Sequence, residues 1–207
     1  MTITVEPATT LPAHAASAAI TIAVLHPKGG VGRSTSSWAL GSELALRGCM
    51  VRIEDLDQAK HLTTVVQRRG LLIPGLTIGE EGQADVVLLD TAPEADTARG
   101  IGYLRRADWA LIPVKGPEEA SVQAIGLVLE WLAAAPNCRL LGFLPTMATP
   151  RWAESRLWME ELQRLADRHG ARVFSPIPTR ASLVAWRLDG HPYAQVAEEI
   201  LHAVRAS

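Results

Sequence analysis

The sequence contains few of the residues from which metal centres and disulfide frameworks are built. Among its 207 residues are two cysteines, Cys49 and Cys138, which lie far apart and form no CxxC motif. The six histidines form no HxxxH or HExxH pair. Because zinc sites use closely spaced cysteine and histidine ligands, we expect no transition-metal centre. Two separated cysteines indicate buried, reduced thiols in a cytosolic protein.

Features that direct a protein into or across a membrane are also absent. No uncharged apolar run is long enough to span a bilayer. The first nineteen residues are rich in Ala, Thr and Pro and lack the basic start and apolar core of a signal peptide. We therefore expect a loose N-terminal tail over residues 1–19, a single domain over residues 20–207, and a cytoplasmic protein.

No strong excess of charge of one sign is present either. The formal net charge is −2, and 48% of the residues are hydrophobic. These values are typical of a globular protein and argue against a disordered acidic chain or a strongly basic nucleic-acid binder. Lysine is scarce, with Lys28, Lys60 and Lys115 against seventeen arginines, a bias of the kind that genomic base composition produces.

Apolar strands and amphipathic helices alternate along the chain from residue 20. The continuous apolar run at residues 20–25 is typical of a strand buried on both faces. Further strands are predicted at residues 50–57, 84–90, 107–114, 138–144 and 171–177, and helices at residues 34–47, 118–134, 152–169 and 192–204. Strands separated by helices predict an α/β fold, a doubly wound and mainly parallel sheet. Residues 58–85 are expected to be a short connection with two turn-like stretches, RRG and LIPGLTIGEEG.

The segment HPKGGVGRSTSS, residues 26–37, has the composition of a phosphate-binding loop between a strand and a helix. Its glycines, Gly29, Gly30 and Gly32, allow the backbone to approach phosphate oxygens closely, and backbone N–H groups then bind the anion. Ser34 is the hydroxyl expected on Mg²⁺, and Thr35 the one near the α-phosphate. A glycine-rich turn with a helix cap is the alternative, but acidic residues at two later strand ends favour the phosphate site.

Three motifs together resemble those of the ParA/MinD group of P-loop ATPases. PKGGVGRST is similar to their deviant Walker A loop, K-G-G-x-G-K-S/T-T. EDLDQ, residues 54–58, resembles the D-x-D that ends their second strand, and VVLLDTAP, residues 86–93, resembles their Walker B strand. Segments 110–125, 140–147 and 177–196 follow in the same order as in the family. The chain looks most like the small plasmid-type ParA partition proteins, which implies a P-loop ATPase fold.

The resemblance implies a role for each matching residue. Lys28 would reach across a dimer interface to the partner's nucleotide, Asp57 would orient the attacking water, and Arg33 would take the place of the loop lysine between the β- and γ-phosphates. Ser34, Asp55 and Asp90 would hold the Mg²⁺ shell. ATP or ADP would be bound by Lys28, Gly29, Gly30, Val31, Gly32, Arg33, Ser34 and Thr35, with Thr146 and Pro178 near the adenine.

The resemblance also implies partners. It predicts a homodimer with ATP, non-specific binding of double-stranded DNA on the nucleoid, and a ParB-type centromere-binding protein. The DNA would be bound by four arginines, Arg151, Arg156, Arg180 and Arg187; exposed arginines are also common on surfaces that bind nothing. No membrane partner is expected, because the apolar face of the last helix lacks bulky aromatic residues and its polar face carries acids. Core packing accounts for that face better.

The sequence departs from the family's pattern at the catalytic positions. Arg33 replaces the loop lysine, and Gln58 and Ala59 stand where the family has Pro and Gln. A planar guanidinium and a compact ammonium are not equivalent in a tight loop, so we expect slow hydrolysis. Two alternatives stay open: a nucleotide-binding regulator or dimerisation module with little turnover, and a MinD-like membrane-cycling ATPase or metabolic enzyme of the same superfamily.

Overall fold

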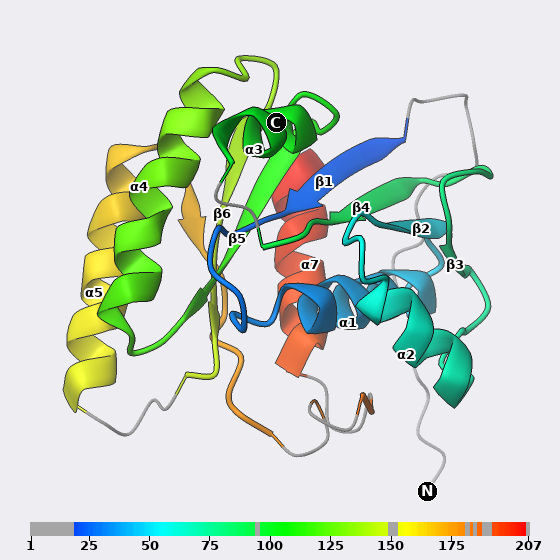
Figure 1. The fold of residues 1–207 in the computed structure, drawn as a ribbon. Coiled ribbons are helices and arrows are strands. Elements are labelled where there is room, and N and C mark those ends of the chain that lie inside the picture. Colours follow the sequence, from blue (N-terminus) through cyan, green and yellow to red (C-terminus); the bar gives the residue numbers. More distant parts are fainter. Residues whose placement is uncertain are drawn as a thin grey trace, which may run out of the picture.

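A sheet of seven parallel strands forms the centre of the protein (Figure 1). The computed structural model describes residues 19–93, 96–148, 153–180, 183, 186–187 and 192–205. The strand order is β3-β2-β4-β1-β5-β6-β7, and every neighbouring pair is parallel. The strands are β1 (Ile20–Val24), β2 (Val51–Asp55), β3 (Leu76–Ile78), β4 (Val86–Asp90), β5 (Trp109–Lys115), β6 (Arg139–Thr146) and β7 (Arg172–Val173). The predicted α/β class with a parallel sheet is confirmed.

Helices cover both faces of this sheet. Helices α1 (Arg33–Leu46), α2 (His61–Arg69) and α7 (Pro192–Arg205) contribute to one hydrophobic core. Helices α3 (Thr97–Leu104), α4 (Glu119–Ala133) and α5 (Ala153–Arg168) contribute to the other. In Figure 1, α4 and α5 lie together on one side of the sheet, away from α1 and α7. The molecule therefore has three layers, helix, sheet and helix.

The central strands explain why their sequences are apolar without alternation. In β1, Ile22 and Val24 pack into the core beneath α1, whereas Ala23 packs into the core beneath α4. Adjacent residues of a strand point to opposite faces, so a strand covered on both sides needs apolar residues at every position. The prediction from the run at residues 20–25 is therefore confirmed, although the strand itself ends at Val24.

The expectation of a plain connection over residues 58–85 is wrong. This segment contains α2 and the edge strand β3, and the RRG stretch is the end of α2, with Gly70 in the left-handed conformation as its C-cap. Helix α2 has nine residues and buries two side chains fully, Leu62 and Val66. Elements this short are stabilised by the surface they pack on rather than by their own propensity. Helix α3, with eight residues, is likewise too short to be predicted from its own sequence.

The observed strands differ from the predicted ranges by one or two residues at most ends, and two differences affect the interpretation. Strand β2 ends at Asp55, so Asp57 lies in the loop that follows and not in the strand. Strand β7 has only two residues of the seven predicted. Beyond it the chain is held by Glu199 of α7, whose carboxylate accepts hydrogen bonds from the Ser175 amide at 3.0 Å and from the Ser175 hydroxyl at 2.6 Å. The amides of Phe174 and Ile177 also donate to the β6 carbonyls of Phe143 and Pro145, at 2.9 and 2.8 Å. The segment after β7 is thus positioned both by the sheet and by a side chain of α7.

The last helix packs as the sequence predicts. Val196 and Ile200 are buried in the core against α1, and Leu201 and Val204 are partly buried beside them. Core packing therefore uses the apolar face of α7. Within the described residues, none of the helices combines the length and apolar character needed to cross a bilayer.

A close contact fixes the connection between β5 and α4. The ring of Trp158, on α5, lies against Gly116 so tightly that a Cβ at that position would come within 2.3 Å of it. Any side chain at Gly116 would force this connection or the indole to move. The segment that leads into α4 is therefore packed directly on α5.

Candidate functional site

The loop between β1 and α1 adopts a conformation that exposes backbone N–H groups. Gly30 and Gly32 have φ angles of 74° and 87°, which L-residues rarely adopt, and Gly32 is the N-cap of α1. The hydroxyl of Thr146, at the end of β6, donates to the Val31 carbonyl at 2.8 Å and anchors the loop. A glycine loop that leads into a helix N-terminus is a general anion-binding arrangement. The sequence-predicted strand, loop and helix are all present.

Arg33 folds back on the start of this loop. Its Nη1 donates a hydrogen bond of 2.7 Å to the His26 carbonyl, and the residue is 8% exposed. Burial lowers the pKa of the guanidinium, while the nearby carboxylates of Asp90 and Asp57 act in the opposite direction. Arginine nevertheless stays protonated in proteins. Arg33 therefore supplies a fixed positive charge, and its hydrogen bond to the His26 carbonyl also stabilises the loop.

Asp90, at the end of β4, is a completely buried carboxyl group beside the loop. Its Oδ1 accepts a hydrogen bond of 3.0 Å from the Ser37 hydroxyl, and its Oδ2 has no hydrogen-bond partner among the residues that the structure describes. Burial raises the pKa of Asp90 to about 7, against the opposing effect of the Ser34 and Ser37 hydroxyls. A buried oxygen without a partner is costly unless a ligand uses it. The donor set fits Mg²⁺, which binds through few carboxylates and retains water.

Asp55 lies beside Asp90, because the two residues end adjacent strands in the same register. Its Oδ2 accepts hydrogen bonds from the Thr63 amide at 2.9 Å and the Thr63 hydroxyl at 2.7 Å, and its Oδ1 accepts one from the Asp57 amide at 3.2 Å. Asp55 thus fastens the start of α2 to the end of β2. Its predicted part in the Mg²⁺ shell stays a prediction.

Asp57 lies in the loop after β2 and borders an open hollow. Its Oδ1 accepts a hydrogen bond of 3.0 Å from the Ala59 amide. The hollow has a volume of about 630 Å³ and is lined by Leu56, Asp57, Gln58, Ala92, Pro93, Arg99, Gly102, Tyr103 and Arg106. Water therefore has access to this carboxylate. In the part of the chain that the structure describes, no three His, Cys, Asp or Glu side chains gather as a protein-only metal centre.

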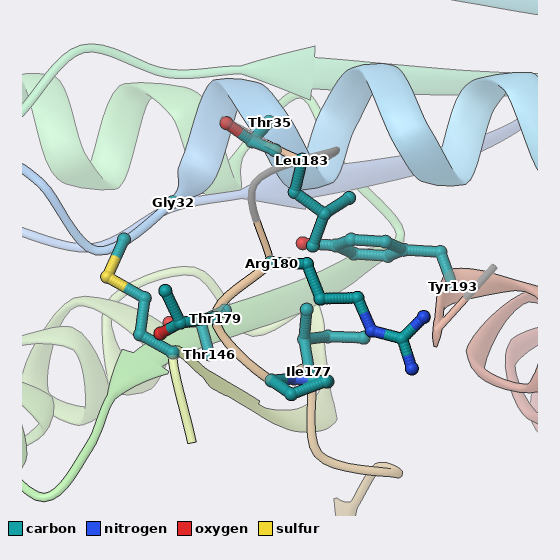
Figure 2. A pocket seen from close by; sticks show the side chains of 10 residues that line it. Gly32, Thr35, Thr146, Ile177, Thr179, Arg180, Leu183 and Tyr193 are labelled. Carbon is teal, nitrogen blue, oxygen red and sulfur yellow. The ribbon is translucent and has the colours of Figure 1, made fainter. Parts of the chain in front are cut away.

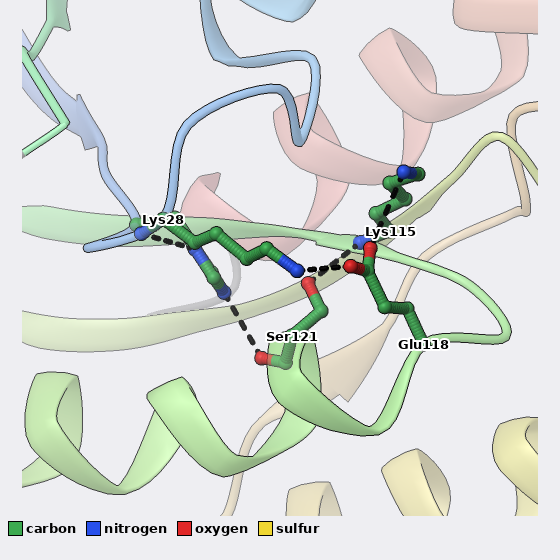
Figure 3. Close-up of polar contacts among 5 residues, drawn as sticks. Lys28, Lys115, Glu118 and Ser121 are labelled. Atoms are coloured by element: carbon green, nitrogen blue, oxygen red, sulfur yellow. Dashed lines mark hydrogen bonds and ion pairs between the residues drawn. The ribbon is translucent and has the colours of Figure 1, made fainter.

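Lys28 is paired within its own subunit. Its ammonium group forms an ion pair with Glu118, the residue before α4, and Lys115 Nζ lies 3.4 Å from the other oxygen of the same carboxylate (Figure 3). The Lys28 amide donates to Nδ1 of His26 at 3.0 Å, so Nε2 carries the ring proton and donates to the Ser121 carbonyl at 3.0 Å. Burial lowers the pKa of His26, consistent with a neutral ring. Sequence reasoning missed His26 and Glu118, because neither residue stands out before the loop and α4 are brought together.

A small cavity lies on the other side of the loop, beside the start of α1 (Figure 2). Its volume is about 150 Å³, and it is lined by Gly32, Thr35, Thr146, Met147, Ile177, Pro178, Thr179, Arg180, Leu183 and Tyr193. The two residues predicted near an adenine, Thr146 and Pro178, both belong to this lining. Tyr193 of α7 closes one wall and shares a hydrogen bond of 2.9 Å with Ser36 of α1. The flat, largely apolar walls suit a heterocyclic base.

The four arginines predicted to bind DNA fall in different places. Arg156 is exposed on α5, Arg187 is exposed after β7, and Arg180 is exposed at the small cavity lined by Thr146 and Pro178. Arg151 lies outside the described residues. These positions are on the surface, as DNA binding requires, but their role stays a prediction.

Comparison with solved structures finds the same fold in proteins of low sequence identity. McdA from Cyanothece, as a variant in complex with ATP, gives a TM-score of 0.74 at 16% identity, covering 90% of this chain and 96% of that chain. A plasmid partition protein of Borrelia burgdorferi bound to AMPPNP gives 0.70 at 18% identity, covering 91% and 99%. Cobyrinic acid a,c-diamide synthase of Mycobacterium smegmatis, with an ATP analogue and magnesium, gives 0.67 at 21% identity, covering 91% and 96%.

The family assignment comes from the sequence profile of a nucleotide-binding domain. Comparison with curated protein sequences gives no significant match. The profile described as the CobQ/CobB/MinD/ParA nucleotide binding domain matches residues 22–193, which include the glycine loop, both strand-end aspartates and the residues that line the small cavity. The chain belongs to the CobQ/CobB/MinD/ParA nucleotide-binding domain family.

Proposed function

We propose that the protein is a DNA-partition ATPase of the ParA type, which binds Mg²⁺–ATP and cycles between monomer and dimer. The observation that carries the proposal is the buried Asp90 beside the phosphate loop, whose Oδ2 has no hydrogen-bond partner within the described part of the chain. A carboxylate in that position is costly in the empty protein and useful with a bound metal–nucleotide complex. The solved neighbours with ATP or its analogues support the same conclusion.

Nucleotide binding follows from the loop and the cavity. The N–H groups of the loop and of the first turn of α1 would bind the phosphates, and Thr35 would contact the α-phosphate. The base would lie in the cavity that contains Thr146 and Pro178. Ser34 and Asp90 would hold the Mg²⁺ shell, with Asp55 behind Asp90. Bound Mg²⁺ would neutralise phosphate charge during phosphoryl transfer.

Turnover would depend on groups from two subunits. Asp57, which faces an open hollow, would position the attacking water. Lys28 would extend into the site of the partner subunit and place its ammonium charge on that nucleotide, giving a nucleotide sandwich dimer. Arg33 would stabilise the phosphates but would follow the moving phosphoryl group poorly, because it is bonded to the His26 carbonyl. Only contacts that strengthen in the transition state raise the rate, so intrinsic hydrolysis would be slow.

DNA and a second protein would act on the dimer. The exposed arginines Arg156, Arg180 and Arg187, together with Arg151, would bind phosphates of any duplex sequence, with an affinity that falls steeply as salt rises. Dimerisation would double the number of these cations on one surface. A ParB-type centromere-binding protein would then stimulate release of the dimer from DNA. The protein would be cytoplasmic and associated with the nucleoid.

A steady-state ATPase assay with and without duplex DNA tests this proposal. Calorimetry should detect binding of ATP or ADP at millimolar concentration in the presence of Mg²⁺. The protein should bind DNA without sequence preference. The double variant Arg180→Glu with Arg187→Glu should lose DNA binding. The charge-matched control Arg164→Glu with Arg168→Glu, on the exposed face of α5, should lose much less. Absence of nucleotide binding, or sequence-selective and salt-insensitive DNA binding, would contradict the proposal.

A second function is favoured by one observation. Arg33 is buried and bonded to the loop's own carbonyl, which suits tight nucleotide binding more than rapid turnover. A nucleotide-binding regulator that dimerises but hardly hydrolyses ATP would have this arrangement. In the same assays it would bind nucleotide and dimerise. It would not bind DNA, and DNA would not change its rate of ATP hydrolysis.

A further inference from the structure

Two of the three lysines in the chain converge on one carboxylate beside the phosphate loop. Lys28 pairs with Oε1 of Glu118, and Lys115 Nζ lies 3.4 Å from Oε2 (Figure 3). The two ammonium groups lower the pKa of Glu118, Lys28 having the larger effect, so its carboxylate is charged at neutral pH. The side chains of Lys28 and Glu118 are about one third exposed, at 35% and 29%. The pair is therefore accessible to a competing anion.

The loop does not need this ion pair to keep its shape. The Lys28 backbone is held by His26, and His26 is held by the Ser121 carbonyl in the first turn of α4. The Ser121 hydroxyl in turn accepts a hydrogen bond of 3.2 Å from the Lys115 amide. None of these bonds involves the ammonium group of Lys28. The ion pair with Glu118 therefore decides only where that ammonium group lies.

We propose that Glu118 competes with the nucleotide of a second subunit for the ammonium group of Lys28, and so opposes dimerisation until a sufficiently charged nucleotide is present. This inference rests on the proposed function, in which Lys28 serves the partner's site. In the monomer, Lys28 is held by its own Glu118. A triphosphate in the partner offers more negative charge than one carboxylate, and a diphosphate offers less than a triphosphate. Competition by Glu118 thus makes the dimer depend on the charge of the bound nucleotide.

Lys115 makes the exchange reversible. When Lys28 leaves, Glu118 would otherwise remain unpaired near the incoming phosphates, which repel it. Lys115 already lies beside the second carboxylate oxygen and can hold Glu118 in that state. Removal of Lys115 should therefore weaken the dimer, whereas removal of the Glu118 charge should strengthen it. Opposite signs from adjacent members of one cluster are not expected of residues that only stabilise the fold.

The test measures dimerisation by light scattering with Mg²⁺ and a non-hydrolysable ATP analogue. A partly exposed ion pair contributes little, so its loss should change the equilibrium about threefold per subunit. Two such pairs break in each dimer, and Glu118→Gln should lower the dimer dissociation constant about tenfold. Lys115→Gln should raise it. The matched control is Glu119→Gln, one residue further on, which is exposed and accepts a hydrogen bond from Gln123 in the next turn of α4.

Lysine labelling examines the ion pair without any dimer. Limiting acetylating reagent is applied to the nucleotide-free protein, and with three lysines each labelled peptide identifies one site. Labelling of Lys28 should rise about threefold in Glu118→Gln and stay unchanged in Glu119→Gln, with Lys60 as the internal reference. Unchanged Lys28 labelling would overturn the proposal at its first step.

The outcomes also separate this inference from the proposed function. If the wild type dimerises with the analogue and Glu118→Gln behaves like Glu119→Gln, competition by Glu118 is wrong and the proposed function stands. If neither the wild type nor Glu118→Gln dimerises, the sandwich dimer is wrong and the competition is overturned with it. A weaker dimer in Glu118→Gln would mean that Glu118 presents Lys28 to the partner, which also overturns the proposal.

Discussion

The ends of β2 and β4 lie side by side in the same register, yet their terminal aspartates are used differently. Both carboxylate oxygens of Asp55 accept hydrogen bonds, from Thr63 and from the Asp57 amide. Asp90 has one oxygen bonded to Ser37, whereas the other has no hydrogen-bond partner in the described residues. Both are almost fully buried, at 5% and 0% exposure. Position in the sheet is therefore not enough to tell a carboxylate with both oxygens hydrogen-bonded from one with an oxygen left unpaired within the described residues.

The difference assigns opposite energetic signs to the two residues. Satisfied hydrogen bonds make Asp55 a source of stability for the empty protein. Burial without full pairing makes Asp90 a cost, which a bound metal–nucleotide complex would offset. Substitutions at the two strand ends should therefore change the stability of the nucleotide-free protein in opposite directions.

The largest effect is expected from Asp90→Asn. The pKa of Asp90 is about 7 in the folded protein, above that of an unfolded aspartate, so the folded state binds more protons between about pH 4 and 7. Stability therefore falls as pH rises through this window. The neutral amide avoids this loss, and the variant should be more stable by on the order of 3 kcal/mol above pH 7. Urea unfolding at pH 5 and pH 8 measures it; an equal gain at both values would contradict the assignment.

Asp55→Ala should destabilise the nucleotide-free protein by about 2 kcal/mol, because it leaves the partly buried donors of Thr63 without their acceptor at the start of α2. The same urea unfolding measures the loss. Asp57→Ala is the matched control, since this loop carboxylate is less buried and accepts a hydrogen bond from the Ala59 amide, two residues further on. It should cost little stability and remove whatever ATPase activity exists. A stability gain in Asp55→Ala would remove the distinction between the two strand ends.

Arg33→Lys tests the positively charged group that lies near the carboxylate of Asp90. The shorter ammonium group cannot keep the same bond to the His26 carbonyl and is free to follow the phosphates. Turnover should rise about tenfold, a change of about 1.4 kcal/mol in the barrier, with a smaller change in nucleotide affinity. Steady-state ATPase assays and calorimetry measure the two quantities separately. An unchanged or lower rate would mean that the loop is adapted to arginine and that Lys28 of the partner supplies the transition-state charge.

The smallest effect is expected from Thr63→Val, which removes one of the bonds to Asp55 and keeps the amide bond. The loss should be about 1 kcal/mol, roughly half that of Asp55→Ala. Thermal unfolding of the two single variants and the double variant provides the comparison. Because both changes act on one contact, the double variant should lose less than the sum. Full additivity would show that the hydroxyl does not contribute through Asp55.

The elements that could be predicted from the sequence are those determined by residues close together in the chain. The apolar runs of β1, β4 and β5 indicate strands buried on both faces, and the glycines before α1 indicate a loop with unusual backbone angles. The sequence did not predict α2, β3 or α3, because short elements depend on the surface they pack against. The bond from Asp55 to Thr63 and the pair of Lys28 with Glu118 join residues 8 and 90 positions apart. Only the folded sheet edge brings such pairs together.

The contact between Trp158 and Gly116 gives the protein an intrinsic optical reporter. The indole lies against the connection that leads to Glu118, and across residues 19–205, apart from the segments that the structure does not describe, its Nε1 has no hydrogen-bond partner. Indole emission responds to the polarity and motion of its surroundings. A variant in which the five other tryptophans are replaced by phenylalanine would confine the signal to this contact. Its emission would follow any movement at the start of α4 in real time, during nucleotide addition and without an attached dye.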